Sequence, residues 1–456
     1  MITKCIPRTV AAAAIAAALL TNAVPRVALA AALKIDRSTL KSGAVLLVSE
    51  QHNLPMVTVA IAFDAGTRHD PQDKAGLATL TASSLMQGTR QLSAMEFNQK
   101  VDFMGGSVSV SAGRDYATAG FTSLKRYQNE TLKLLAAVLT EPGLRDADIQ
   151  RKRAELLAAI KANEEQPGYV AGVTFDRKLF GDEPYGNPAL GTTESMSKLT
   201  PDDVRRYYRG HYRLGGAIIA VAGDVTAAEI APLLDAQLAG LAGTVPKQPE
   251  PPKIEVARGI HTEVIDRDVT QANIALGFGG IARSNPDYYR VSVMNHILGA
   301  GGFGSRLMDI VRSKQGLAYS IGSAFEAGLF QGEFVVSLQT KNQSANEALR
   351  LILQQLREIQ EKPVEDAELD RAKKYMIGSF PLRIDRQGAI ANFMLQIEYY
   401  GLGLDYAEKY PGYIDAVSKQ DVLDVARRYL HPESMIVVAV ADQQEAKIDT
   451  SRLGAR

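Results

Sequence analysis

Two stretches near the start of the chain have the alternating or continuous apolar pattern of β-strands. They are AVLLVSE at 44–50 and MVTVAIAFDAG at 56–66, and QHNLP between them has the composition of a turn. Together they predict a hairpin. Helical periodicity follows over 74–88 and 93–104, and a second hairpin is predicted over 106–124.

A long helical region and one more strand complete this half of the chain. Helical periodicity runs from 125 to 212, and the apolar stretch AIIAVAG follows at 217–223. The same order of elements begins again at Gln271. Long helices beside antiparallel strand pairs, present twice, predict an α+β fold with helices packed on one face of each antiparallel-rich sheet.

Two pairs of segments are similar between the halves, which indicates an internal duplication. LTPDDVRRYYRGHYRLGGAIIAVAGD at 199–224 aligns without a gap with VSKQDVLDVARRYLHPESMIVVAVAD at 417–442. PGLRDADIQRKRAEL at 142–156 aligns with KPVEDAELDRAKKYM at 362–376. We therefore expect two homologous domains.

The boundary between these domains is predicted at GTVPKQPEPPKIEV, residues 243–256. The prolines of this segment favour an extended, semi-rigid connector. The prediction places an N-terminal domain at 31–242 and a C-terminal domain at 257–456. A chain of 456 residues is long enough for two large domains.

The first thirty residues have the pattern of a secretory signal peptide. Lys4 and Arg8 precede an apolar run from Thr9 to Ala23, and Ala28-Leu29-Ala30 has the small-x-small pattern of a cleavage site. A membrane anchor is the alternative, but the run is shorter than the roughly 20 residues that a spanning helix needs. We expect cleavage after Ala30 and a periplasmic protein without a membrane attachment.

Composition and charge exclude several classes of protein. The chain is 46% hydrophobic and 22% charged, as globular proteins are, and Lys+Arg and Asp+Glu both number 51. Nucleic acid is not an expected partner, because no global basic field exists to hold phosphates. The only cysteine, Cys5, lies in the predicted signal peptide, so the mature chain has neither a disulfide nor a thiolate metal site.

Residues 63–89, FDAGTRHDPQDKAGLATLTASSLMQGT, resemble the start of pitrilysin-type zinc peptidases, a family that includes the mitochondrial processing peptidases. Those enzymes carry the inverted motif H-x-x-E-H between Gly-Leu-Ala and Gly-Thr landmarks. Its two His bind Zn²⁺ and its Glu activates the metal-bound water. Here the His positions are Thr79 and Ser83, the Glu position is Ala82, and the family's third ligand position falls on Ala159. The resemblance therefore implies a family member that lacks the zinc ligands and the general base.

The histidines offer no local substitute for that motif. The sequence contains six His, and no two of them lie within five residues of each other, so only a long-range metal site stays open. We expect His69-Asp70, at the exit of the predicted first hairpin, to be a solvated pair. His296, in a helical stretch, is expected to be a buried or interfacial imidazole.

The second half resembles the family's substrate-contacting block. GAGGFGSRLMDIVRSKQGLAYSIGSAF at 299–325 is similar to the glycine-rich turn, the Ser-Arg-Leu helix and the Gly-Leu-x-Tyr strand of active members. By resemblance, the Tyr319 hydroxyl donates to the carbonyl oxygen that gains charge during peptide hydrolysis, and Arg312 binds a neighbouring main-chain carbonyl. The alternative is an ordinary surface Arg and a core Tyr.

The glycines of this block also have two interpretations. Gly299, Gly301 and Gly304 spell G-x-G-x-x-G, but a helical stretch at 286–298 precedes them, where a dinucleotide site needs a strand. By resemblance, Gly299, Gly301, Gly302 and Gly304 are weak candidates for substrate contact. Tight turns alone also require glycine.

The resemblance as a whole implies the metal-free, non-catalytic subunit of a secreted bacterial heterodimeric zinc peptidase. In this interpretation the chain is a half-shell of two domains, is inactive alone and binds no cofactor. A homologous partner subunit holds the zinc, and this chain supplies Arg312 and Tyr319.

Substrates of such a pair would be short or unfolded peptides, held as an added strand on a sheet edge. The equivalent edge strand in this chain is predicted at Gly105–Gly113. The alternative function is a non-proteolytic peptide-binding or structural scaffold protein of the same fold.

Overall fold

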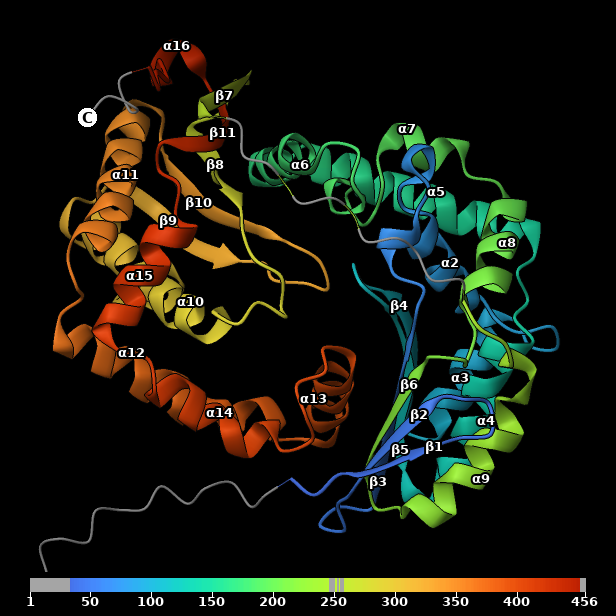
Figure 1. Ribbon diagram of the computed structural model, residues 1–456. Helices are drawn as coiled ribbons and strands as arrows, with labels where there is room; N and C mark the ends of the chain where they lie inside the picture. Colours follow the sequence, from blue (N-terminus) through green and yellow to red (C-terminus); the bar gives the residue numbers. More distant parts are fainter. Residues whose placement is uncertain (1–32, 246–250, 252–253, 255–257, 452–456) are drawn as a thin grey trace, which may run out of the picture. The chain divides into compact units, whose positions relative to one another are not determined.

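The computed structural model describes residues 33–245, 251, 254 and 258–451. The chain divides into a short unit, Met1–Lys34, and one compact unit, Ile35–Arg456, which contains every helix and strand named below (Figure 1). The predicted signal peptide at 1–30 lies outside the described residues, and so does most of the predicted connector at 243–256. No described helix is long and apolar enough to cross a membrane.

The first half contains a six-stranded sheet with the order β1-β2-β6-β3-β5-β4. Its strands are β1 (Asp36–Thr39), β2 (Val45–Glu50), β3 (Met56–Phe63), β4 (Ser107–Ala112), β5 (Ala117–Leu124) and β6 (Ile218–Gly223). β2 and β6 run parallel, and the other neighbouring pairs are antiparallel. The strand predicted at Gly105–Gly113 is β4, and it lies at an edge of the sheet.

The predicted first hairpin is wrong. β2 and β3 are strands at the predicted positions, but β6 lies between them and pairs with both. Every residue of β6 is buried. A strand that is apolar on both faces is stable only inside a covered sheet, and that explains its central place. β4 and β5 do form the second predicted hairpin.

The second half contains a five-stranded sheet with the order β7-β11-β8-β10-β9. Its strands are β7 (Gly259–Asp266), β8 (Gln271–Gly279), β9 (Ala318–Phe325), β10 (Glu333–Lys341) and β11 (Ser434–Ala441). β7 and β11 are parallel, and the other pairs are antiparallel. The order and directions repeat those of β2-β6-β3-β5-β4, so the sheets match strand for strand apart from β1. β7 lies within the predicted C-terminal domain but precedes Gln271, where the sequence predicted the repeated order of elements to begin.

The segments that are similar in sequence also fold alike. α5 (Asp146–Glu164) and α12 (Asp366–Ser379) begin at residues that the alignment superimposes. α8 (Pro201–His211) and α15 (Lys419–Tyr429) each begin with a capping box and each lead into the strand that is inserted in the sheet, β6 or β11. The predicted α+β class with two sheets is confirmed, and the domain boundaries stay predictions.

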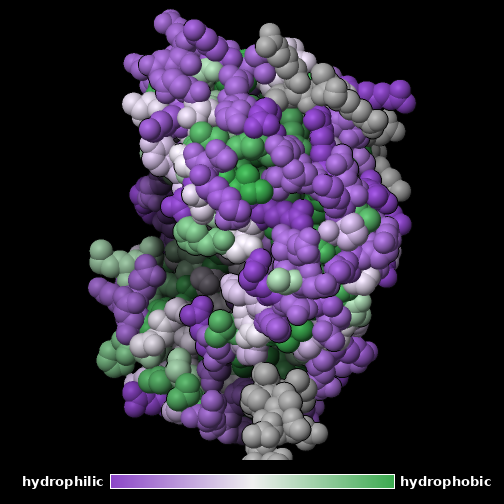
Figure 2. Space-filling model, turned by 90° about the vertical axis from the view of Figure 1, so that its left-hand side faces the viewer, coloured by the Kyte–Doolittle hydropathy of each residue, from purple (hydrophilic) through white to green (hydrophobic). Residues whose placement is uncertain are grey.

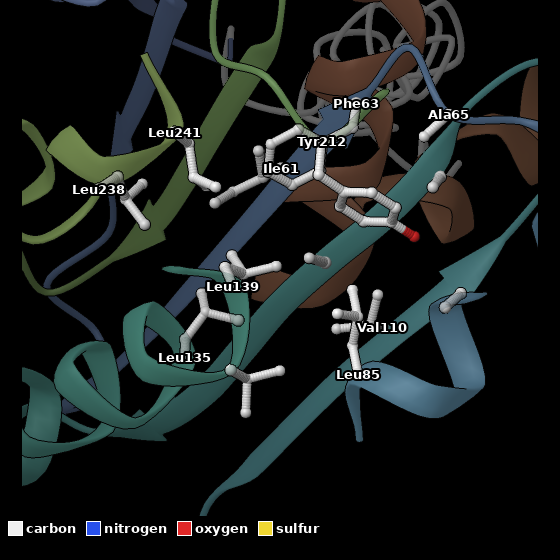
Figure 3. Close-up of a cluster of buried hydrophobic side chains, with 14 of the residues drawn as sticks. Ile61, Phe63, Ala65, Leu85, Val110, Leu135, Leu139, Tyr212, Leu238 and Leu241 are labelled. Carbon is white, nitrogen blue, oxygen red and sulfur yellow. The ribbon is translucent and has the colours of Figure 1, made fainter. Parts of the chain in front are cut away.

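One face of the first sheet carries the core of the first half. α2 (Leu77–Leu85) and α3 (Ala94–Phe103) pack on β4, α4 (Gln128–Thr140) packs on β4 and β5, and α9 (Ala227–Gln237) packs on β2. Figure 3 shows Leu135 and Leu139, one turn apart on α4, beside Ile61 of β3. All three side chains are fully buried. The spacing of four residues on the helix and of two on the strand therefore decides which side chains enter this core.

Each sheet also receives one helix from the opposite half. α6 (Pro167–Phe180), from the first half, packs on β8 and β11 of the second sheet. α13 (Gln387–Tyr399), from the second half, packs on β3 and β6 of the first sheet. The arrangement predicted from the sequence, with helices on one face of each sheet, does not include this exchange. The remaining α-helices are α7 (Thr193–Lys198), α10 (Tyr288–Asn295), α11 (Ala345–Glu361), α14 (Tyr406–Asp415) and α16 (Gln443–Ala446).

Asp115, in the turn between β4 and β5, joins the two halves. Its carboxylate accepts hydrogen bonds from the Tyr400 hydroxyl at 3.0 Å and from the backbone N–H of Leu329 at 2.9 Å, both in the second half. The Tyr185 hydroxyl donates to the other carboxylate oxygen. Asp115 is buried, and charge-assisted hydrogen bonds of this kind are the strong ones in a protein interior.

Candidate functional site

α2 carries the positions at which the resemblance places the zinc motif. The Thr79 hydroxyl donates a 2.5 Å hydrogen bond to the carbonyl oxygen of Ala189. Ala82 is 1% exposed and belongs to the core of the first half. Ser83 is half-buried. The family motif has two imidazoles and a carboxylate at these positions. This chain has the hydroxyls of Thr79 and Ser83 and the methyl group of Ala82 there.

The third ligand position, Ala159, is an exposed residue of α5. α5 packs against α2, so the two helices that the motif needs are in contact although their ligands are missing. Glu155, one turn before Ala159, pairs with Lys152. Across the described residues, no three His, Cys, Asp or Glu side chains are arranged to hold a metal ion. The residues of α2 and α5 do not fit zinc.

Asp70 holds the start of α2 in place. Its carboxylate accepts hydrogen bonds of 2.8 Å from the backbone N–H groups of Gly76 and Ala78. Burial raises the pKa of Asp70 to about 7, and these backbone hydrogen bonds oppose that shift. Asp70 and its neighbour His69 are both buried. The prediction of a solvated His69-Asp70 pair is wrong, because the chain turns inward after β3 to cap α2.

The buried His69 forms a cluster with Asp64 and His211, which are both half-buried. His69 Nε2 lies 2.6 Å from Asp64 Oδ1, and His211 Nδ1 lies 3.2 Å from the Asp64 carbonyl oxygen. The two imidazole centroids are 4.6 Å apart, and Arg68 completes an ion pair with Asp64. The sequence left open a long-range metal site, but within the described residues this cluster is not among the groups that could hold a metal ion. No local signal identified the contact between the two histidines, because the segment after β3 and the end of α8 supply its members.

Electrostatics in this cluster keep His211 neutral. Burial lowers the pKa of His211 to about 4, and the neighbouring His69 adds to the shift. Burial would raise the pKa of Asp64, but the hydrogen bond with His69 and the charge of Arg68 outweigh it and hold that pKa below its usual value. The cluster is a fixed polar network beside the start of α2.

Arg312 and Tyr319 lie on neighbouring elements at the edge of the second sheet. Arg312 belongs to the π-helical segment η8 (Met308–Lys314), and Tyr319 belongs to the edge strand β9. The Arg312 guanidinium carbon lies 4.9 Å from the ring centroid of Phe303. Phe303 and Tyr319 are 74% and 49% exposed. The alternative of a core tyrosine is therefore wrong, and contact of Arg312 and Tyr319 with a substrate stays a prediction.

The four glycines before η8 differ in what the structure requires of them. A Cβ at Gly299 would lie 2.3 Å from Ser323 Oγ of β9, and a Cβ at Gly301 would lie 2.5 Å from the His296 carbonyl oxygen. Packing alone explains these two. Gly302 has a φ of +57°, and both Gly302 and Gly304 are exposed. A substrate contact by the four glycines stays a prediction.

His296 is a half-buried residue that stacks on Tyr375, with ring centroids 5.1 Å apart. Burial lowers the pKa of His296. The imidazole thus packs against its own domain, as the sequence led us to expect.

Figure 2 shows that one side of the molecule is mostly hydrophilic and that its hydrophobic side chains gather in patches.

The duplicated sheets, the exchanged helices and the altered motif on α2 define a peptidase-like fold with no zinc site among the described residues. The family described as Insulinase (Peptidase family M16) matches residues 45–193, and the Peptidase M16 inactive domain matches residues 198–376. The chain belongs to peptidase family M16.

Relatives with similar sequences have names that differ in the activity they claim. The chain is 28% identical to the non-peptidase homolog YmxG of Helicobacter pylori, over 88% of this chain and 93% of that protein. It is 27% identical to an uncharacterized zinc protease of Streptomyces coelicolor, over 91% and 92%. It is 25% identical to a probable mitochondrial-processing peptidase subunit beta of Arabidopsis thaliana, over 90% and 78%. The residues on α2 agree with the first of these names.

Solved structures show the same fold. A peptidase M16 inactive domain from Pseudomonas fluorescens matches with a TM-score of 0.84 and 26% identity, over 90% of this chain and 98% of that one. A protease from Helicobacter pylori matches with a TM-score of 0.83 and 21% identity, over 90% and 100%. The chain is thus a non-catalytic member of family M16 by its residues and by these comparisons.

Proposed function

We propose that this chain is the non-catalytic subunit of a heterodimeric zinc metallopeptidase in the periplasm. A homologous subunit holds the zinc, its ligands and the general base. This chain completes the chamber for short or unfolded peptides and contributes Arg312 and Tyr319 to the substrate.

One contrast supports the proposal above all others. Every position of the zinc motif is replaced, by Thr79, Ala82, Ser83 and Ala159, while the arginine and tyrosine of the second half keep their spacing and lie at an exposed sheet edge. Random substitution in an inactive enzyme is not expected to remove every residue of the zinc motif and to preserve the arginine and the tyrosine. A subunit that acts on a neighbour's substrate needs the second set alone.

Tyr319 has the chemistry that this role needs. Its phenol is a hydroxyl donor on the edge strand β9, where Tyr319 lies at a β-bulge between Ala318 and Ser320, which both pair with β10. A preorganised donor aimed at a developing oxyanion stabilises the transition state more than the ground state. Arg312 offers a guanidinium supported by the ring of Phe303.

Sedimentation velocity tests the pairing directly. The chain is mixed with a co-encoded homologue that contains H-x-x-E-H, and each protein is also run alone. The proposal predicts a new species with the mass of one copy of each. If each protein sediments in the mixture as it does alone, the pairing is wrong and the peptide-binding or scaffold alternative takes its place.

A further inference from the structure

A cavity of about 1170 Å³ lies between the first sheet and the exchanged helix α13. Thr58 of β3 and Thr122 of β5 line one wall, and α13 with the preceding turn η10 (Phe380–Ile384) lines the other. Val57 and Val59 point into the helical core, so Thr58 points to the opposite face of the sheet. The cavity is thus formed by the helix exchange and belongs to neither sheet alone.

Arg283 is a buried cation in the wall of this cavity. It is 9% exposed, and its guanidinium carbon lies 3.7 Å from the ring centroid of Tyr288. One guanidinium nitrogen donates to the Tyr406 hydroxyl at 3.1 Å. Within the described residues, no carboxylate forms an ion pair with Arg283. Burying a charge without an opposite charge is costly, so this guanidinium is poised for an anion.

The duplication supplies an internal comparison for Arg283. Ala62 pairs with Ile218 in the first sheet as Gly277 pairs with Ile436 in the second, and the sequence repeat superimposes the two isoleucines. Ala62 and Gly277 are therefore equivalent positions. Arg68 and Arg283 each follow these positions at the same distance along the chain, so Arg68 is the counterpart of Arg283. Arg68 pairs with Asp64, whereas the counterpart of Asp64 is Gly279. The second half therefore has the arginine but has a glycine in place of the aspartate that pairs with it in the first half.

The start of α13 adds a second attraction for an anion. This helix has 13 residues, its N-cap residue Arg386 makes no side-chain capping bond, and its first turn contains no acidic residue. Gln387, Gly388 and Ala389 of this first turn line the cavity. A Cβ at Gly388 would meet no atom within 4 Å, so the backbone there is open. Unpaired N–H groups and the helix dipole favour a negative group at such a position.

The rest of the lining favours an organic anion with a peptide-like body. Arg383 and Arg386 also line the cavity, and among the described residues that line it Asp385 is the only acidic one. Apolar and amide side chains of α13 complete the wall, namely Ile390, Asn392, Phe393, Gln396 and Ile397. The guanidinium fork matches a planar carboxylate, the amides match peptide N–H and C=O groups, and the apolar side chains match an apolar residue.

We propose that this cavity binds the C-terminal carboxylate of a short peptide that ends in an apolar residue. The carboxylate lies between Arg283 and the start of α13, and the apolar side chain packs on Ile390 and Phe393. The site lies within this chain, so it does not depend on the partner subunit proposed above.

Isothermal titration calorimetry on the whole chain tests this proposal with three probes. They are the tripeptide N-acetyl-Ala-Ala-Leu as a free acid, the same peptide as a C-terminal amide, and inorganic phosphate. The free acid should bind at least about tenfold more tightly than the amide, as expected when a charged hydrogen-bonding group is removed. Equal binding of acid and amide overturns the proposal. Phosphate that binds as tightly as the peptide acid also overturns it, because the site is then a general anion site.

Variants identify the residue responsible. Arg283→Met should weaken binding of the free acid by about tenfold or more, because it removes the cation that faces the carboxylate. Because Arg283 also donates to Tyr406 and stacks on Tyr288, the melting temperature of the free variant is measured beside it to check that it is folded. Arg386→Gln, at the exposed rim, should weaken binding less. Arg209→Gln, on the exposed part of α8 and outside the cavity lining, is the control and should bind as the wild type does. If Arg283→Met and Arg386→Gln both bind like the control, the assignment is wrong.

Discussion

The hydroxyl of Thr79 donates a 2.5 Å hydrogen bond to the carbonyl oxygen of Ala189. The family resemblance places an imidazole at this position. In this chain the side chain instead forms a hydrogen bond with the backbone of Ala189. One turn on, Ala82 is packed in the core. The helix that holds zinc in active relatives has therefore become a packing element in this chain.

Ala82 and Ala159 offer the same substitution in opposite surroundings. Ala82→Glu should destabilise the chain by roughly 2–5 kcal/mol, because it overpacks the core and buries a carboxyl without a partner. Ala159→Glu is the matched control on the exposed face of α5, and its effect should stay within about 0.5 kcal/mol. Urea unfolding measures both. Equal stability of the two variants would show that α2 is not packed as described.

Tyr319→Phe should lower the turnover of the reconstituted pair by about 10²–10³-fold, the effect of losing one oxyanion donor. Because Tyr319 is half exposed, the stability of the chain should change by less than about 0.5 kcal/mol. Tyr375→Phe, which also removes an exposed hydroxyl, is the control and should keep wild-type turnover. Wild-type turnover of Tyr319→Phe would exclude the role proposed for it.

The folding stability should depend on pH through His211. The folded pKa is about 4, against an ordinary value of 6.5, so the unfolded chain binds a proton between these values that the folded chain does not. The contribution of His211 to stability is thus complete above pH 6.5, falls as the pH drops and levels off below pH 4. Burial of the imidazole is the main cause of this window, and the groups that face the imidazole are His69, Asp64, Arg68 and Tyr207.

His211→Asn removes this titration. The difference in unfolding free energy between wild type and His211→Asn should therefore change between pH 7 and pH 5, and urea unfolding at both pH values measures it. Arg209→Gln, on the same helix, should show no such change relative to the wild type. A difference that is constant across this range means that His211 titrates normally.

Asp115 should be the most sensitive contact between the halves. Asp115→Ala leaves the hydroxyls of Tyr185 and Tyr400 and the N–H of Leu329 without their acceptor, which should cost about 3 kcal/mol or more. Tyr400→Phe removes one of these donors and should cost about 1–2 kcal/mol. Thermal unfolding gives both values. An effect of Asp115→Ala no larger than that of Tyr400→Phe contradicts this account of the joint.

The sequence predicted the elements whose signals are local. The helix expected over 93–104, which is α3, and the hairpin of β4 and β5 follow from periodicity and turn composition. The insertion of β6 between β2 and β3 does not, because strand partners far apart in sequence leave no trace in local periodicity. The exchange of α6 and α13 was missed for the same reason.

In the candidate site, too, the features with a local signal could be predicted and those that depend on distant segments could not. The replacement of the two histidines and the glutamate can be read from the motif itself, because Thr79, Ala82 and Ser83 lie on one helix. The His69–His211 contact and the missing carboxylate beside Arg283 could not be found, since both depend on which segments the fold brings together. His69 was wrongly expected to be solvated because the loop after β3 has a polar composition, whereas it turns inward.

Peptide hydrolysis and zinc content, measured on the chain, on a co-encoded homologue with H-x-x-E-H and on their mixture, test the central claim most directly. The account predicts that this chain alone holds no zinc and cleaves nothing, and that the mixture holds one zinc per pair and cleaves a short unstructured peptide faster than the homologue alone. Zinc and activity in this chain by itself, or a mixture no more active than the homologue, would contradict it.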